Sequence, residues 1–361
     1  MVFNADGSKP DVKKNSVDIA KWAFTIDPAE DWKQMYKDAW RMERDYSYDR
    51  DMHGVDWNEV FTHYQPLLER VTDRHELDDV LAQMISELSA LHMTVSGGDK
   101  RTSQVSMQNG FLGASLERDE RAGGYKISHI YRSDPDFPAG LSPLAQSGSK
   151  IMEMDVIVAI NGVNTLDVQN INELLVNKGD VQVRLKLRNR SGGYYEEIVK
   201  PVNASALSAL RYNSWEYSRR QTVDSVSKGR IGYLHLKAMG GGDYDDFVKG
   251  FYPSLGREGL IIDVRHNRGG NIDSWILEKL MRKAWFYWAP RVGNQYPNMQ
   301  MAFTGHMVVL INQNTASDGE AFAEGFRRLG LGKLIGTRTW GGEIWLSSSN
   351  RLVDNGIATA A

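Results

Sequence analysis

Apolar residues recur at helical spacing in the first part of the chain. Between Asp31 and Ala90, apolar positions three and four residues apart predict three helices separated by short polar loops. Asp56 directly precedes the second of these helices, and its carboxylate is expected to cap it. The stripes are rich in aromatic side chains, and their helical spacing favours a packed core over a ligand groove. This part of the chain therefore predicts a small helical subdomain.

The pattern changes to short apolar or alternating runs between about Ser106 and Val202. Four such runs are strand candidates, and a helix is predicted for LDVQNINELLV, residues 166–176. From about Ser205 onward, apolar strands alternate with helices, which favours a layered α/β structure with a largely parallel sheet. The chain therefore combines a helical, a β-rich and an α/β segment.

Composition excludes several classes of function. The chain has 361 residues, 41% of them hydrophobic, which is enough for two or three folded domains. A formal net charge of −3 provides no basic field for nucleic acid or a membrane surface. No apolar run approaches the roughly 20 residues that span a bilayer, and the first twenty residues lack the apolar core of a secretory signal. The absence of cysteine excludes disulfides and thiol nucleophiles, and it fits a reducing compartment.

A serine stands between a strand and a helix in NTASDGEAFAEGFRRLG, residues 314–330. The apolar run HMVVLIN precedes it, and the first turn of the following helix has backbone N–H groups without intrahelical partners. This place suits a nucleophile whose carbonyl adduct carries an oxyanion. It also suits a serine that only caps the helix, and spacing alone favours the cap for Ser317.

A second turn lies in DVRHNRGGNIDSW, residues 263–275, where a strand ends in Gly269 and Gly270. Glycines let the backbone approach a ligand and present N–H groups, although such a pair also occurs in ordinary turns. Both turns follow predicted parallel strands, whose carboxyl ends form the usual ligand edge of an α/β sheet. A serine nucleophile also needs a base, and spacing does not choose among the eight histidines. No pair of histidines has the spacing of a zinc-binding helix, which disfavours a metallopeptidase.

Longer segments resemble a known family. SPLAQSGSKIMEMDVIVAINGV resembles the PDZ modules of peptidases, with Met154 where these usually have glycine, and GFLG (residues 110–113) resembles their carboxylate-binding loop. The segments that contain IGYLHLKAM, DVRHNRGG and NTASDGEAF resemble the tricorn protease core and, more distantly, the C-terminal processing peptidases. The resemblance is collinear from about residue 20. It implies an α/β composite catalytic domain, with ClpP/crotonase-like βα layers plus a helical subdomain, and an inserted β-rich PDZ-like domain.

The resemblance also implies boundaries and partners. Residues 1–20 are expected to be a linker or the remnant of an N-terminal domain, 21–104 the helical catalytic subdomain, 105–202 the PDZ-like domain, and 203–361 the α/β catalytic subdomain, truncated at its C-terminus. The family implies peptide substrates, no cofactor and no metal, and a homo-oligomer formed through the catalytic core. No nucleic-acid or membrane partner is expected. A cytoplasmic location is expected, or a periplasmic one if a signal was lost with an N-terminal part.

The family motifs assign roles to individual residues. Ser317 matches the nucleophile of N-x-x-S-D-G, and the N–H of Asp318 would form part of the oxyanion hole. Gly269 or Gly270, in D-V-R-x-N-x-G-G, would supply the other N–H. The family's base matches His92 in ELSALHM. The implied function is a serine peptidase that hydrolyses peptides or partly degraded proteins.

Two departures from the family pattern leave an alternative open. Leu91 stands where the family usually has a serine that orients the histidine, and a leucine side chain makes no hydrogen bond. The family's distal glutamate lies beyond the segment that ends this chain, and the motif does not give its role to Glu343, the nearest carboxylate. The alternative is a catalytically impaired peptide-binding scaffold. A crotonase-like acyl-CoA enzyme, the third possibility, is disfavoured by the PDZ-like insertion.

Leu91→Ser is expected to raise peptide hydrolysis in a longer protein that continues beyond Ala361, and to change little in the 361-residue chain. The reason is that an oriented imidazole accepts the proton more readily, and each tenfold gain in rate corresponds to about 1.4 kcal/mol of barrier. The measurement compares both lengths, each with and without the substitution. Equal rates for the two longer proteins would show that another group orients the histidine.

Overall fold

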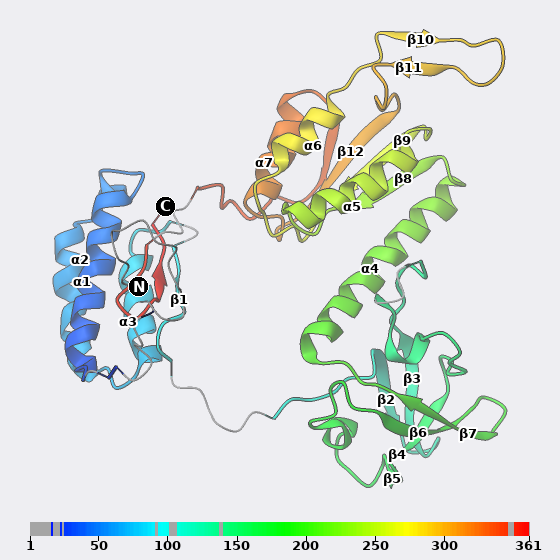
Figure 1. Cartoon of the computed structure of the whole chain (residues 1–361), viewed down its shortest axis with the longest axis horizontal. Helices are drawn as coiled ribbons and strands as arrows, with labels where there is room; N and C mark the ends of the chain where they lie inside the picture. The colour runs from blue at the N-terminus through cyan, green and yellow to red at the C-terminus, as the bar shows by residue number, and fades with distance from the viewer. Residues whose placement is uncertain are drawn as a thin grey trace. The chain divides into compact units, whose positions relative to one another are not determined.

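The computed structural model describes residues 25–90, 93–100, 107–136, 140–345 and 350–360, together with residues 16, 22 and 23. The chain forms two compact units, Met1–Thr102 with Ile344–Ala361, and Ser103–Glu343 (Figure 1). Among the described residues, the smaller unit has one hydrophobic core and the larger unit has two. No helix within the described ranges is long and apolar enough to cross a membrane.

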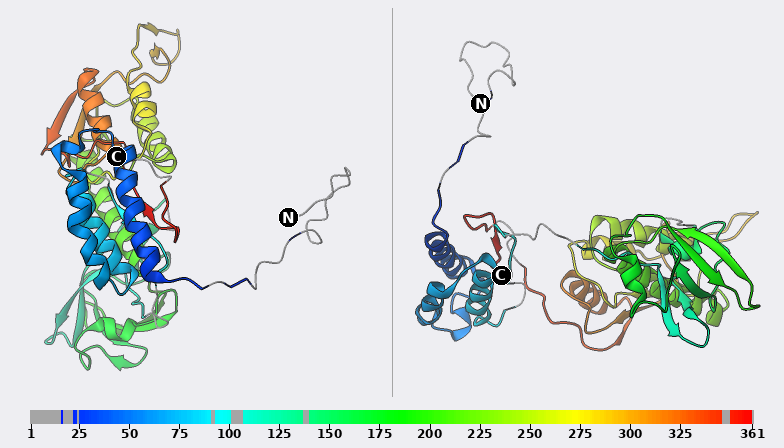
Figure 2. Two further views of the ribbon diagram at one scale, coloured as in Figure 1. Left: turned by 90° about the vertical axis from the view of Figure 1, so that its left-hand side faces the viewer. Right: turned by 90° about the horizontal axis from the view of Figure 1, so that it is seen from below.

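Three helices pack side by side in the smaller unit (Figure 2). They are α1 (Pro28–Tyr46), α2 (Trp57–Tyr64) and α3 (Arg74–Ser86), and the 3-10 helices η1 (Met52–Gly54) and η2 (Gln65–Arg70) lie between them. Each α-helix starts at an aspartate cap, and the cap predicted at Asp56 is confirmed. The aromatic stripe lies in the core, where the indole N–H groups of Trp40 and Trp57 each donate to the other residue's carbonyl, at 2.7 and 2.9 Å.

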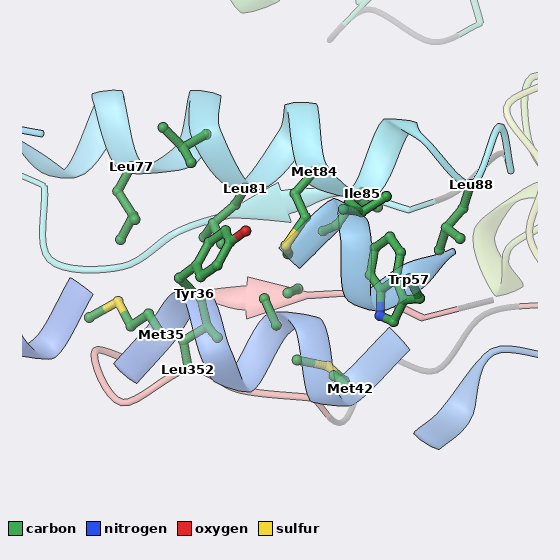
Figure 3. Packing of buried hydrophobic residues seen from close by; sticks show 14 of the residues in the cluster. Met35, Tyr36, Met42, Trp57, Leu77, Leu81, Met84, Ile85, Leu88 and Leu352 are labelled. Atoms are coloured by element: carbon green, nitrogen blue, oxygen red, sulfur yellow. The ribbon is translucent and has the colours of Figure 1, made fainter. Parts of the chain in front are cut away.

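Residues 350–360 contribute to this helical core. Strand β1 (Val95–Ser96) pairs antiparallel with β14 (Ile357–Ala358). Leu352 lies among the apolar side chains of the helices (Figure 3). Arg74 on α3 is buried, and its Nε donates to Asp354 at 2.6 Å. Residues 344–361 therefore group with the helices, whereas the rest of the predicted α/β range, 203–343, lies in the larger unit.

The first part of the larger unit is a β-sheet domain with the strand order β2-β3-β4-β6-β7, and β5 beside β4. The strands are β2 (Ala114–Asp119), β3 (Gly124–Ile130), β4 (Val156–Ile160), β5 (Val163–Asn164), β6 (Val183–Arg188) and β7 (Tyr194–Val199), accompanied by η4 (Pro143–Ala145) and η5 (Ile171–Leu175). The helix predicted for residues 166–176 is wrong, since only η5 forms there. Val176 bridges to Asn109, and this extended pairing ends the helical turn.

The second part is a four-stranded parallel sheet in the order β13-β12-β9-β8, which confirms the predicted parallel layer. Its elements are α4 (Ala204–Ser227), β8 (Ile231–His235), α5 (Gly241–Phe251), η6 (Tyr252–Ser254), β9 (Gly259–Asp263), α6 (Asp273–Leu280), β12 (His306–Ile311), α7 (Asp318–Arg328) and β13 (Lys333–Gly336). The hairpin of β10 (Phe286–Trp288) and β11 (Tyr296–Asn298) projects from this sheet (Figure 1). Because β8, β9 and β12 are parallel, their carboxyl ends lie at the same edge of the sheet, and the loops that follow them form the candidate site.

Glu43 on α1 is a buried carboxyl group in the helical unit. It is 0% exposed, and neither carboxyl oxygen has a hydrogen-bond partner among the described residues. Burial raises the pKa of Glu43 to about 8, because a charged carboxylate is poorly solvated there. Since this folded-state pKa exceeds the ordinary value near 4.5, the contribution of Glu43 to stability is fully present below pH 4.5 and is lost as the pH rises through 8.

Glu43→Gln is therefore expected to raise the melting temperature strongly at pH 8 and only slightly at pH 5. The reason is that the Glu43 carboxyl group ionises readily in the unfolded chain but poorly when it is buried, so at pH 8 it favours unfolding. Glu59 is exposed and lies in the first turn of α2, so Glu59→Gln serves as the matched control. It should shift the melting temperature by the same small amount at both pH values, through the loss of a favourable charge at the helix N-terminus. Thermal unfolding followed by circular dichroism measures both. A shift for Glu43→Gln of the same size at the two pH values would contradict the argument.

Candidate active site

Three loops meet at the carboxyl edge of the parallel sheet. Met239, after β8, donates its N–H to Gly269 O at 2.8 Å, and it accepts the Asn271 N–H at 2.9 Å. A Cβ added to Gly269 would lie 2.5 Å from the Cβ of Ser317, which follows β12. The structure thus brings the predicted nucleophile turn and the predicted glycine turn into direct contact.

Ser317 has an unusual backbone conformation, with φ 52° and ψ −130°. Few residues other than glycine adopt positive φ, and such strain persists only where the surroundings impose it. A serine that only capped α7 would direct its hydroxyl to a helix N–H. Here the Glu320 N–H donates to the main-chain carbonyl of Ser317 at 2.6 Å instead, and Ser317 Oγ makes no cap hydrogen bond to a described residue. Ser317 is only partly buried, so the hydroxyl is available at the sheet edge.

The two glycines of the second turn differ in what their N–H groups contact. The Gly269 N–H donates to Asn267 Oδ1 at 2.8 Å. The Gly270 N–H has no acceptor among the described residues, and Gly270 is exposed. The Asp318 N–H, at the first position of α7, also has none within the described ranges. Within the described part of the chain, the N–H groups of Gly270 and Asp318 therefore remain without acceptors in the turns beside Ser317.

Two side chains to which the sequence analysis gave no role hold these loops together. Asn267 is fully buried. Its side-chain Nδ2 donates to Leu236 O at 2.9 Å, and its main-chain carbonyl accepts the Ala316 N–H at 2.9 Å. Glu320 accepts the Ser317 N–H on Oε2 at 2.9 Å. The asparagine of D-V-R-x-N-x-G-G was a signal for the first contact. The spacing Ser317-x-x-Glu320 was a signal for the second contact, because it is the pattern of a capping box.

Asp318 contributes a buried carboxyl group as well as its N–H. Its Oδ2 accepts the N–H groups of Ile272 and Asp273 at 2.7 and 3.1 Å, at the start of α6. Burial raises the pKa of Asp318, and the neighbouring Asp273 adds to that rise. The side chain thus joins the first residues of α6 and α7, and its backbone faces the site.

His92 and Leu91 lie outside the described residues. Two histidines of the larger unit lie at this sheet edge, but other groups bind them. The ring nitrogens of His266 lie 3.1 and 3.3 Å from the amide nitrogens of Asn314 and Asn312. His235 is buried and bonded to the Tyr212 hydroxyl, and burial lowers its pKa to about 4. No hydrogen bond joins Ser317 Oγ to any histidine in the described part of the chain.

The predicted carboxylate-binding loop of the β-sheet domain has internal partners. The N–H groups of Gly110 and Phe111 donate to the carbonyls of Leu175 and Val202, both at 2.8 Å. The guanidinium of Arg118, on β2, reaches the carbonyls of Leu166 and Val168 at 3.2 and 2.8 Å. These two N–H groups of the GFLG segment are therefore not available to a peptide carboxylate.

Comparisons with known proteins match the same three segments. The tricorn protease C1 domain matches residues 28–86, the tricorn protease PDZ domain residues 110–204, and peptidase family S41 residues 230–360. Tricorn protease homolog 1 of Streptomyces coelicolor is 34% identical over 98% of this chain and 33% of its own length. A putative tricorn-like protease C-terminal subunit of Sulfurisphaera tokodaii is 35% identical over 98% of this chain and 40% of its own length. The crystal structure of the tricorn protease matches with a TM-score of 0.85 and 29% identity, over 94% of this chain and 33% of that one.

The helical unit, the PDZ domain and the βα layers define a protein of the S41 peptidase class. Within this class, the chain belongs to the tricorn protease family. The expected family and fold class, including the β-rich PDZ domain, are confirmed. The chain spans 33% and 40% of the lengths of the two curated relatives.

Gly269→Ala is expected to destabilise the larger unit more than Gly330→Ala. Both glycines have positive φ, of 80° and 67°, so both substitutions carry the backbone cost of roughly 1 kcal/mol. Only the Cβ at Gly269 meets Ser317, whereas the one at Gly330 meets no atom within 4 Å. Overpacking adds about 1–3 kcal/mol.

Urea unfolding of the two variants measures this difference. Equal losses of stability in Gly269→Ala and Gly330→Ala would show that Ser317 moves aside freely, and that the close contact between the two turns is not enforced.

Proposed function

We propose that this chain is the catalytic part of a serine peptidase that hydrolyses peptides or partly degraded proteins. Ser317 is the nucleophile and His92 the general base. The N–H groups of Asp318 and Gly270 form the oxyanion hole. Membership of a peptidase family supports the reaction class, the turn around Ser317 supports the role of that serine, and the resemblance in ELSALHM supports His92.

One observation carries the proposal. The Ser317 hydroxyl is not used as a helix cap, and two backbone N–H groups without acceptors in the described ranges lie in the turns beside it. An oxyanion formed at that point gains two hydrogen bonds that the planar carbonyl of the substrate makes less well. Gly269 has a different part in this proposal: with its N–H bonded to Asn267, it provides the space that Ser317 occupies.

The chemical steps follow from these proposed roles. Ser317 Oγ bonds to the substrate carbonyl carbon, the carbonyl electron pair moves to oxygen, and the hydroxyl proton passes to the His92 imidazole. The oxyanion reforms the carbonyl, the C–N bond breaks, and the imidazolium returns the proton to the leaving amine. Water then hydrolyses the acyl-enzyme by the same route. No step requires a metal or a cofactor.

The proposal extends to partners. The chain forms a homo-oligomer through its catalytic core, and the β10–β11 hairpin offers an exposed aromatic surface for that contact. Trp285, Tyr287 and Trp288 are about half exposed or more there. In the PDZ domain, β7 lies at the edge of the sheet, where β6 is its one partner among the described strands. An extended peptide can add to such an edge.

The alternative is a peptide-binding scaffold of the same family without catalysis. Leu91, in place of the orienting serine, favours it. The two functions differ in one observable property, which is covalent reaction at Ser317 with an electrophile that mimics the substrate carbonyl.

Ser317→Ala is expected to abolish labelling by a fluorophosphonate and peptide hydrolysis, while stability changes by at most about 1 kcal/mol, the value of a helix cap. Ser274→Ala, at an exposed serine in the first turn of α6, is the matched control and should be labelled like the original protein. Unchanged hydrolysis in Ser317→Ala would refute the nucleophile. Peptide binding without labelling of the original chain would support the scaffold.

A further inference from the structure

Glu320 makes more hydrogen bonds than a helix cap requires. It lies in the first turn of α7 and is 8% exposed. Its Oε2 accepts the N–H groups of Ser317 and Gly342 at 2.9 and 2.8 Å, and its Oε1 accepts the Gly341 N–H at 2.6 Å. The Thr339 side chain is a further donor. Only the bond to Ser317 belongs to the helix terminus, and the others come from the loop after β13.

That loop, residues 339–343, is joined to the nucleophile turn at two places. Besides the contacts with Glu320, the Trp340 N–H donates to Thr315 O at 3.0 Å, two residues before Ser317. Gly341 has a φ of 88°, which lets two successive N–H groups point at one carboxylate. The segment Thr339-Trp340-Gly341-Gly342 therefore directs several hydrogen-bond donors at the Glu320 carboxylate.

The carboxylate of Glu320 remains charged in this setting. Burial by itself would raise the pKa of Glu320, but the hydrogen bonds from Thr339, Gly341, Gly342 and Ser317 outweigh burial, and the pKa lies below its ordinary value. Hydrogen bonds to a charged acceptor are roughly twice as strong as neutral ones. Because one of them takes the Ser317 N–H, it also fixes the strained backbone of that residue.

We propose that Glu320 is a positioning residue for the reaction. Its carboxylate holds Ser317 in the turn that presents Oγ, and it holds residues 339–343 against that turn. The inference rests on the proposed role of Ser317. Glu320 exchanges no proton with the substrate and acts only through the main chain, so its loss lowers the rate of acylation while the helix that carries it stays folded.

The first test compares Glu320→Gln with Glu324→Gln in the full 361-residue chain. Glutamine has the same size but a single acceptor oxygen, so its amide nitrogen must face an N–H donor. Glu324 lies on the same helix, partly exposed, and is paired with Arg327 and Arg328, which makes it the matched control. Glu320→Gln is expected to slow fluorophosphonate labelling of Ser317 at least tenfold, and to lower kcat for peptide hydrolysis more than it changes KM. Glu324→Gln should change neither.

Hydrogen exchange provides a readout that does not depend on chemistry. In Glu320→Gln, the peptide spanning residues 337–345 should exchange faster than in the original protein, and α7 should exchange at its original rate. Gly342→Pro removes one donor from the loop side and leaves Glu320 and α7 unaltered, so it tests the same contact if Glu320→Gln does not fold. It should slow labelling and speed exchange at the Gly341 amide.

The outcomes separate the inference from the proposed function. Labelling at the original rate in Glu320→Gln or Gly342→Pro overturns the positioning role, whatever the exchange shows, and leaves Ser317 as the nucleophile. If the original chain shows no Ser317-dependent labelling, the proposed function fails. In that case the exchange measurement on Glu320→Gln still tests the contact between Glu320 and the loop. Unchanged exchange over residues 337–345 overturns this contact as well, and faster exchange supports the contact.

Discussion

The strained backbone of Ser317 is the feature to which the surrounding structure is fitted. A conformation of this kind costs of order 1–3 kcal/mol, and buried side chains from the loop after β9 and from the first turn of α7 offset it. Asn267 binds the glycine turn, Asp318 binds the start of α6, and Glu320 binds both Ser317 and the loop after β13. Each of them satisfies main-chain donors that would otherwise be buried without partners. The loops after β9, β12 and β13 therefore meet at Ser317, although they lie far apart in the sequence.

Much of the fold followed from the pattern of apolar residues. Helices α1 to α3 have clear apolar stripes and aspartate caps, and β8, β9 and β12 are short apolar runs that the sequence analysis identified. Helix α4 was not predicted, because its buried side chains are confined to its first half, at Leu207, Leu210 and Ser214. Residues 166–176 have helical composition, but pairing of Val176 with Asn109 outweighs that local preference. Long-range pairing of this kind leaves no periodic signal.

The sequence motifs name the residues of the candidate site. They give Ser317, Asp318 and the two glycines, but the difference between the N–H groups of Gly269 and Gly270 depends on where the Asn267 side chain points. Met154 is a similar case. It adopts a φ of 75° at the position where related PDZ modules have glycine, so the turn imposes its conformation on a residue that does not favour it. Such conformational demands become visible only in the three-dimensional structure.

The pairing of β1 with β14 has a consequence for how the protein is made. Arg74 and Asp354 lie 280 residues apart in sequence, and Leu352 fills part of the helical core. At ordinary rates of synthesis, on the order of tens of seconds separate the two partners as they emerge. The larger unit, whose residues are contiguous, can complete its sheet in that interval. The helices, which are synthesised before the larger unit, can thus close their core only after it, and until residues 350–358 arrive they expose an unfinished apolar surface that a chaperone is suited to cover.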